Sequence, residues 1–284
     1  MNPITMKLVV DDLILQALRE DITFEDVSTA SVCPTARPAT VELIAKADGI
    51  IAGLDVFART FELLDSQSSV LFDVADGDEV HAGDHVGQVR GDARVLLSGE
   101  RVALNYLQRM SGIATMTHRY VKKLEGLHTR ILDTRKTTPG MRMLEKEAVK
   151  IGGGVNHRIG LFDMILLKDN HVDFAGGIEN AISRCHDYLK VKGKDLKIEI
   201  EVRNLDELKE VMRVGGVDRI MLDNFSPELT KEAVKIVGGK YEIESSGGIT
   251  FDTIRDYAES GVDFVSVGAL THSVKGLDMS FKAC

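Results

Sequence analysis

The stretch Arg130-Ile131-Leu132-Asp133-Thr134-Arg135-Lys136 joins a short apolar run to a polar, cationic end. The chain then passes through Thr137-Thr138-Pro139-Gly140 to Arg142. An apolar run followed at once by charges and hydroxyls predicts a buried strand that ends at a functional corner, because such side chains are costly in a core. Guanidinium and ammonium groups hold anions well, so this corner suits a small molecule with several negative charges.

A helix is expected to follow the corner. Thr137 or Thr138 can cap its first turn, Pro139 is tolerated there, and residues 141–150 continue the helix. The free N–H groups at the start of this helix would add to the anion-binding field.

The pattern of a short apolar strand followed by a helix-length segment recurs five more times. The further runs are 164–167, 197–200, 219–222, 241–243 and 264–267. Strands that alternate with helices form βα units and a parallel sheet. Six such units in succession predict a barrel or near-barrel rather than an open sheet.

All six predicted strands end in polar residues or glycine. In chain order these ends are Thr134-Arg135-Lys136; Lys168-Asp169-Asn170-His171; Glu201; Asp223-Asn224; Glu244-Ser245-Ser246-Gly247-Gly248; and Gly268. The carboxyl ends of barrel strands converge on one mouth, where active sites lie. Solvation alone does not explain polar residues at every end, so the mouth is the predicted functional site.

The cations of this mouth indicate the class of ligand. They are Arg135, Lys136, His157, Arg158 and Lys168. Clustered cations repel one another unless an anion lies between them, and each charge-assisted hydrogen bond contributes roughly 1.5–3 kcal/mol. The predicted ligand therefore carries several negative charges.

Two carboxylates, Glu201 and Asp223, close successive strands at the same mouth. Bare carboxylates would repel a polyanion, whereas Mg²⁺ accepts a few carboxylates, several waters and substrate phosphates. Contact with substrate hydroxyls is the other functional interpretation. The structural alternative is that the two acids only form ion pairs with Lys168 or Arg158.

Glycines mark a candidate phosphate site. Ser245-Ser246-Gly247-Gly248 stands between a strand and a helix expected to begin near Phe251, where free N–H groups can hold phosphate. Gly268 matches the phosphate position after the late strands of such barrels. Gly152-Gly153-Gly154 is interpreted as a flexible loop that delivers the side chains around Arg158.

The first part of the chain has a mixed α and β pattern. The predicted helices cover residues 11–19, 54–64 and 98–124, and a half-buried strand covers residues 40–45. Arg101 and Arg109 lie in the long helix, where the simplest interpretation makes both of them solvated surface residues. The doubled Gly-Asp-x-x-Val phrase at 77–86 resembles the hairpins of biotinyl and lipoyl carriers. No lysine lies near it, so we interpret its glycines as turns of a small β-layer.

Composition excludes other classes of protein. A net charge of -9 over 284 residues argues against nucleic acid or an anionic membrane as the main partner. No apolar run is long enough to span a bilayer, and the N-terminus lacks a signal-peptide pattern. Cys33, Cys185 and Cys284 have neither metal-type nor disulfide spacing, so a reduced, cytoplasmic setting is expected.

Several phrases, taken in order, resemble the nicotinate-nucleotide pyrophosphorylase (carboxylating) family, also called quinolinate phosphoribosyltransferase. They are Glu100–Asn105 with Ser111–Thr115, Asp133–Arg142, Gly152–Arg158, Leu167–His171, Glu199–Val202, Leu222–Asn224 and Glu244–Ile249. The resemblance implies an α/β fold with an N-terminal α/β sandwich (1–112, joined by 270–284) and an incomplete parallel α/β barrel (113–269) that carries the active site.

The resemblance also implies the reaction. A pentosyltransferase of this family transfers phosphoribose from 5-phosphoribosyl 1-diphosphate to the ring nitrogen of quinolinate, with decarboxylation and with Mg²⁺ as cofactor. The products are nicotinate mononucleotide, diphosphate and CO₂, a step of NAD biosynthesis. Once glycosylated, the ring nitrogen can accept the electrons released by decarboxylation, so the chemistry needs no protein nucleophile.

Residue roles follow from the resemblance. A homodimer is implied in which Arg101 reaches the partner's mouth, which replaces its interpretation as a surface residue. With Arg101, the quinolinate carboxylates would be held by Arg135, His157 and Arg158, and Lys136 and Lys168 would lie between quinolinate and diphosphate. Glu201 and Asp223 would face the ribose and hold Mg²⁺; these two acids and the two lysines are the catalytic set. The remaining substrate contacts would be Thr134, Ser245, Ser246, Gly247, Gly248, Ser266, Val267 and Gly268.

Three other functions are considered. A molybdenum-associated relative with the same fold would use another base or acceptor, but the arginine and histidine set favours a dicarboxylate. A Schiff-base aldolase would use Lys168 at its strand end. A phosphate-sensing barrel would bind ligand and release no CO₂.

Overall fold

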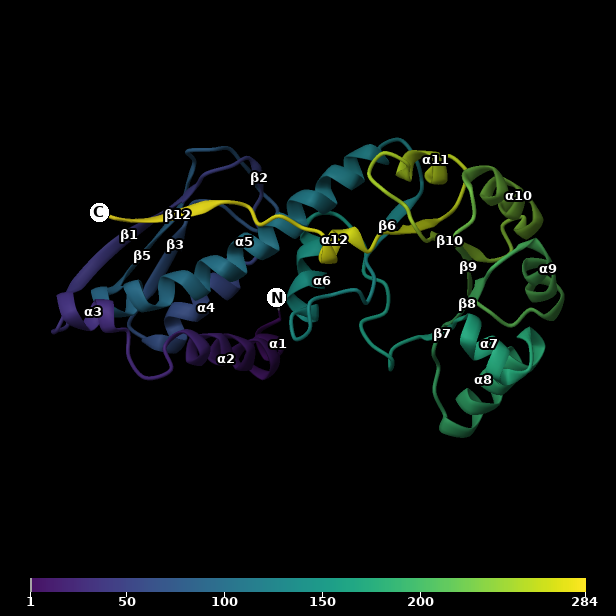
Figure 1. Cartoon of the computed structure of the whole chain (residues 1–284), viewed down its shortest axis with the longest axis horizontal. Helices are drawn as coiled ribbons and strands as arrows, with labels where there is room; N and C mark the ends of the chain where they lie inside the picture. Colours follow the sequence, from purple (N-terminus) through teal and green to yellow (C-terminus); the bar gives the residue numbers. More distant parts are fainter. Residues whose placement is uncertain (1) are drawn as a thin grey trace. The chain divides into compact units, whose positions relative to one another are not determined.

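The computed structural model describes residues 2–284, and the chain divides into two compact units (Figure 1). The first unit takes the chain up to His118, with Thr137–Gly153 and Ser273–Cys284 added to it. The second unit comprises Arg119–Lys136 and Gly154–His272. Each unit therefore combines segments that are distant in the sequence.

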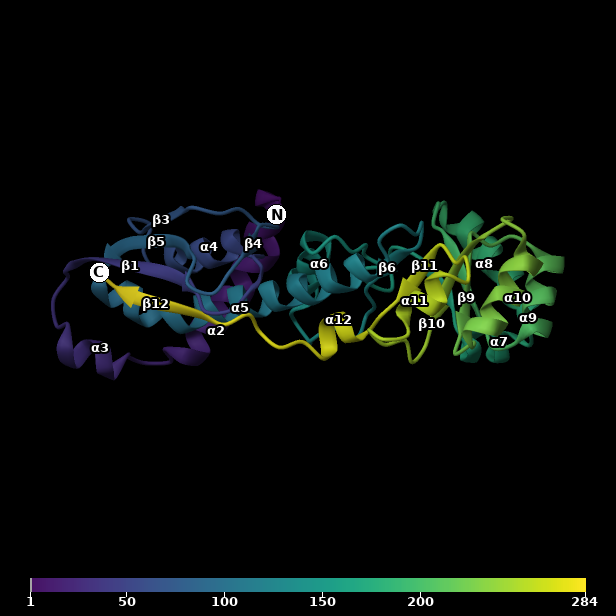
Figure 2. The ribbon, with the colours of Figure 1, turned by 90° about the horizontal axis from the view of Figure 1, so that it is seen from above.

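A four-stranded antiparallel sheet forms one layer of the first unit. Its strand order is β12 (Met279–Ala283), β1 (Pro38–Ala45), β5 (His85–Asp92), β3 (Ser69–Phe72). The C-terminal strand β12 lies along β1 (Figure 2), and the register places Phe281 opposite Leu43. Buried residues alternate along β1, because successive side chains of a strand point to opposite faces.

Helices supply the rest of the first unit. They are α1 (Pro3–Thr5), the π-helical turn η1 (Met6–Val10), α2 (Asp11–Asp21), α3 (Val27–Val32), α4 (Leu54–Leu64), α5 (Ala93–Lys123), which begins in this unit, and α6 (Arg142–Ile151). Phe57 and Phe61 of α4 pack with Leu104 and Leu107 of α5 against the sheet. Each such fully buried side chain contributes roughly 1.5–3 kcal/mol. The predicted strand at 40–45 and all three predicted helices are confirmed.

The doubled Gly-Asp phrase forms turns of a small β-layer, as predicted. β2 (Gly49–Ile50) pairs with β4 (Glu79–Val80) in a separate two-stranded sheet. Gly77 and Gly83 have φ angles of 100° and 101°, a left-handed region that glycine adopts without a steric cost.

Six parallel strands form the sheet of the second unit. Their order is β6 (Arg130–Leu132), β11 (Phe264–Ser266), β10 (Glu242–Ser246), β9 (Arg219–Asp223), β8 (Ile198–Val202), β7 (Ile165–Leu167). Within the described residues no ladder joins β6 to β7, so the barrel is not closed between the two ends of this order. The predicted parallel, incomplete α/β barrel is confirmed.

The helices between these strands have local start signals. They are α7 (Asp169–Ala175), α8 (Ile178–Lys192), α9 (Leu205–Val214), α10 (Pro227–Val237), α11 (Ile254–Ala258) and α12 (Ala269–His272). Asn204 caps α9 by accepting hydrogen bonds from two backbone N–H groups, and Ser226 caps α10 just before Pro227. No helix among residues 2–284 has both the length and the apolar character needed to cross a bilayer.

Two predicted helix starts are wrong. α6 begins at Arg142 with no side-chain cap, because the N–H of Thr138 donates to the carboxylate of Glu145 at 3.0 Å and residues 138–141 form a turn. Pro139 therefore precedes the helix, and α6 belongs to the first unit. The helix expected near Phe251 begins only at Ile254, after a turn closed by Thr250 and Thr253.

Candidate active site

The carboxyl ends of the six parallel strands surround a cavity of about 640 Å³ in the second unit. The predicted site residues that line it are Thr134, Arg135, Lys136, His157, Arg158, Lys168, Glu201, Asp223, Ser246, Gly247, Gly248 and Ser266. The fold therefore collects cations, acids and glycine backbone from distant positions of the sequence into one cavity, a composition suited to a polyanion.

Strand register explains why these side chains share one face. Glu201 of β8 lies opposite Met221 of β9, and Ser246 of β10 lies opposite Asp223. Since side chains alternate along a strand, Glu201, Asp223 and Ser246 all point to the same side of the sheet. Glu201 lies within β8 rather than after it, because this strand continues to Val202.

Four predicted residues do not line the cavity. Ser245 and Val267 are each 1% exposed. Each is the direct neighbour of a residue that faces the cavity, Ser246 or Ser266, so its own side chain points to the opposite side. Gly268 packs beside the stem of Lys136, where an added Cβ would come within 3.0 Å of Lys136 Cδ. Arg101 is exposed on α5 in the first unit.

Two guanidinium groups form the cationic wall of the cavity. Arg158 is 8% exposed, and its Nη1 donates to the backbone oxygen of Met164 at 3.4 Å. Burial and the nearby charge of Arg135 lower the pKa of Arg158. Arg135 Nε is buried without a hydrogen-bond partner among the described residues. A bound dianion would relieve both the repulsion and the unmet donor.

The acids face the same space. Burial, together with the charge of Asp223, raises the pKa of Glu201, and Lys168 opposes this rise. Lys168 Nζ lies 3.5 Å from Glu201 Oε2, so the ion-pair interpretation holds for Glu201 in this structure. Both carboxylates also border the cavity, and such hard oxygen donors beside open space fit the ligand preferences of Mg²⁺.

A hydrogen bond to its backbone holds Lys136, and the backbone conformation of the turn after β10 explains its two glycines. The hydroxyl of Thr271 donates to the backbone oxygen of Lys136 at 2.9 Å. Gly247 and Gly248 have φ angles of 98° and 63°, which favour residues without a Cβ.

A buried charge cluster, which was not predicted from the sequence, includes His157 and Glu244 of the cavity lining. His157 Nε2 lies 2.9 Å from Glu199 Oε2 and 3.4 Å from Glu244 Oε2, and Arg219 Nη1 lies 3.3 Å from Glu244 Oε2. Glu199 and Glu244 precede Glu201 and Ser246 by two positions, the period that places side chains on one strand face. This two-residue spacing was the signal in the sequence from which the cluster could have been predicted. His157, Glu199 and Glu244 have the spacing of a metal site, but Arg219 already neutralises part of their charge.

Protonation of His157 follows from its carboxylate neighbours. Burial lowers the pKa of this imidazole, but Glu199 and Glu244 outweigh burial and raise it to about 9. The N–H of Arg158 lies 2.7 Å from His157 Nδ1, a contact that would suit a neutral ring. We assign the charged imidazolium to His157, because two buried carboxylates need a second positive charge beside Arg219. Arg158 directly follows His157 in the chain, so the covalent link by itself brings its N–H close to the ring.

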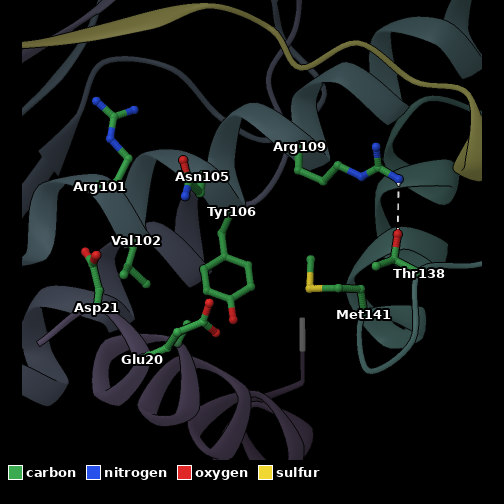
Figure 3. A pocket seen from close by; sticks show the side chains of 10 residues that line it. Glu20, Asp21, Arg101, Val102, Asn105, Tyr106, Arg109, Thr138 and Met141 are labelled. Carbon is green, nitrogen blue, oxygen red and sulfur yellow. Dashed lines mark hydrogen bonds between the residues drawn. The ribbon is translucent and has the colours of Figure 1, made fainter. Parts of the chain in front are cut away.

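The first unit contains a separate pocket of about 610 Å³ (Figure 3). Arg101, Asn105 and Arg109 line it from α5, opposite Glu20 and Asp21 from the end of α2. Arg101 makes no hydrogen bond or ion pair among the residues described. The prediction that Arg109 is a solvated surface residue is wrong.

Arg109 is held by buried and backbone groups. Its Nη2 lies 2.8 Å from Glu145 Oε1, and the Glu145 side chain has no exposed surface. Its Nη1 also donates to the backbone oxygen of Val274 at 3.3 Å. Arg142 also lies in the first unit, and it donates from Nε to Thr137 Oγ1 at 3.1 Å.

Comparison with known proteins identifies close relatives. The family model described as "Quinolinate phosphoribosyl transferase, N-terminal domain" matches residues 21–111, and that of the C-terminal domain matches residues 113–282. The chain is 43% identical to the chloroplastic nicotinate-nucleotide pyrophosphorylase [carboxylating] of Arabidopsis thaliana over 281 residues, covering 94% of this chain and 80% of the relative. It is 41% identical to the probable enzyme of that name from Bacillus subtilis, covering 99% and 94% of the two chains. The crystal structure of NadC from Streptococcus pyogenes matches with a TM-score of 0.92 at 43% identity, covering 99% of this chain and 97% of that one.

Proposed function

The chain belongs to the quinolinate phosphoribosyltransferase family, and from this membership we propose how its cavity performs the reaction. The protein is a phosphoribosyltransferase of NAD biosynthesis, a carboxylating nicotinate-nucleotide pyrophosphorylase. Its substrates are quinolinate and 5-phosphoribosyl 1-diphosphate. The observation that carries the assignment to this site is the cavity itself, where Arg135 and the buried Arg158 line the same space as Glu201 and Asp223.

The cationic wall would bind quinolinate. Arg135 offers an unmet Nε donor and Arg158 a second guanidinium to the two carboxylates, and the cationic His157 adds charge at the same wall. Lys136 and Lys168, both exposed at the rim, would stabilise the charge that develops on the leaving diphosphate. The loop of Ser246 and Gly247 would hold the 5-phosphate.

Mg²⁺ is the proposed cofactor, with Glu201 and Asp223 as the residues that would hold it. When bound, the ion would supply charge neutralisation at the diphosphate. Lys168 lies close enough to Glu201 to serve as the counter-ion of this carboxylate.

We also propose a homodimer in which Arg101 enters the cavity of the partner subunit. Two facts support this arrangement. Arg101 lies outside the unit that contains the barrel cavity, and its exposed guanidinium has no partner among the described residues. The cytoplasmic location expected from the cysteine pattern also remains a proposal, which cell fractionation would check.

The function is tested by mixing the protein with quinolinate, 5-phosphoribosyl 1-diphosphate and Mg²⁺. Nicotinate mononucleotide and CO₂ should form in equal amounts, and chelation of the metal should stop the reaction until Mg²⁺ is restored. Nicotinate, which lacks the second carboxylate, is the control substrate and should react poorly. Folded protein that forms no product would overturn the assignment.

A further inference from the structure

Asn224 has an unusual backbone conformation at the mouth of the cavity. With a φ of 56°, it is the single non-glycine residue with positive φ in the described chain. Asn adopts this left-handed region more readily than most residues, yet a backbone of this kind persists only where surrounding contacts hold it. Asn224 follows Asp223 directly at the end of β9 and lines the cavity.

Three contacts hold Asn224 between the ends of two strands. Its side-chain Nδ2 donates to Asp223 Oδ2 at 2.8 Å, and its backbone N–H donates to the oxygen of Ser246 at 2.8 Å. Its side-chain Oδ1 occupies the place where a Cβ on Gly247 would stand, with Asn224 Cγ only 2.6 Å from that position. One residue thus contacts both an acid of the cavity and the glycine turn after β10.

We propose that Asn224 is a positioning residue that fixes the Asp223 carboxylate relative to the glycine turn after β10. The proposal rests on the proposed function, in which Asp223 faces the ribose and Mg²⁺ and the turn binds the 5-phosphate. A phosphoribosyl donor must contact both groups at once, so their separation determines how well it binds. The exposure of Asn224 argues against a role in core packing.

This geometry also explains why residue 247 is glycine. A side chain there would displace the Asn224 amide and with it the hydrogen bond to Asp223. Gly248 has positive φ too, at +63°, but an added Cβ there would meet nothing within 4 Å. A side chain is strained at both positions by the positive φ, but only at residue 247 would it also collide with Asn224.

Asn224→Gly removes the amide while allowing the left-handed backbone. Partners that orient metal ligands typically change affinity or activity about 10- to 100-fold when lost. We expect KM for 5-phosphoribosyl 1-diphosphate to rise about 10-fold, KM for quinolinate to change little, and the thermal unfolding midpoint to stay close to that of the wild type. Binding of Mn²⁺, followed by water proton relaxation without turnover, should weaken by a similar factor.

A double-mutant cycle measures the coupling between Asn224 and Gly247 in donor binding, which a purely structural role of Asn224 would not produce. Gly247→Ala should weaken donor binding strongly in the wild type and much less in the Asn224→Gly background, because the amide it displaces is then absent. Gly248→Ala should have the same effect in both backgrounds. Unchanged donor and Mn²⁺ affinity in folded Asn224→Gly, or additive effects of Gly247→Ala, would overturn the proposal. A wild-type protein that makes no product would instead contradict the proposed function.

Discussion

His157 shows how neighbours decide the charge of a single side chain. A lone histidine in a sequence predicts a group that titrates near neutrality. Here two carboxylates, from β8 and β10, keep the imidazole charged, and burial raises the pKa of Glu199 to about 7. His157 was predicted as a cavity cation from its place in a loop beside the strand ends, whereas its pairing with Glu199 and Glu244 was not predicted.

The charge of His157 predicts a dependence of stability on pH. Its pKa is raised from 6.5 to about 9 in the folded chain, so its contribution is complete below pH 6.5 and is lost as pH rises through 9. This shift corresponds to an order of magnitude of about 3 kcal/mol at most. In His157→Gln the urea midpoint should fall less steeply between pH 7 and 9 than in the wild type. Parallel pH curves for the two proteins would contradict a charged His157.

At the scale of elements, Glu145 connects α6 to α5 and to the turn before α6. Its Oε1 accepts from Arg109 Nε and Nη2, and its Oε2 accepts from the N–H of Thr138. The sequence identified both helices, since each has an apolar stripe with helical spacing. It did not identify the link between the two helices, because Arg109 and Glu145 are thirty-six positions apart in the chain.

Removal of this link should destabilise the protein. Glu145→Ala removes the acceptor of Arg109 Nε and of the Thr138 N–H, whereas Arg109 Nη1 keeps its bond to Val274, so the loss should approach but not exceed the cost of about 3–5 kcal/mol for a fully buried pair. Glu147→Ala on the same helix removes the exposed pair with Lys150 and should cost less than about 1 kcal/mol. Urea unfolding at constant slope measures the difference. Equal midpoints for the two variants would show that the buried pair contributes little.

At the scale of the whole molecule, the proposed homodimer places two complete cavities between two chains. Arg101→Ala and Lys168→Ala should each be nearly inactive alone, with losses of about 10²–10³ in rate for one missing charge-stabilising donor. Mixed and re-equilibrated, the two variants should regain activity, because one cavity of each mixed dimer keeps both residues. Subunit exchange is verified with differently tagged chains. Verified exchange without recovery would show that Arg101 acts within its own chain or not at all.

The sequence by itself determined the repeating strand–helix order, the parallel barrel and the polar strand ends, because these depend on local periodicity and composition. Tertiary structure decided which residues those ends present. Register between neighbouring strands turned Ser245 and Val267 away from the cavity and placed Glu199 and Glu244 beside His157. Long-range hydrogen bonds to Glu145 and Val274 enclosed Arg109. Such pairings depend on groups that meet only when distant segments pack together, so no local pattern encodes them.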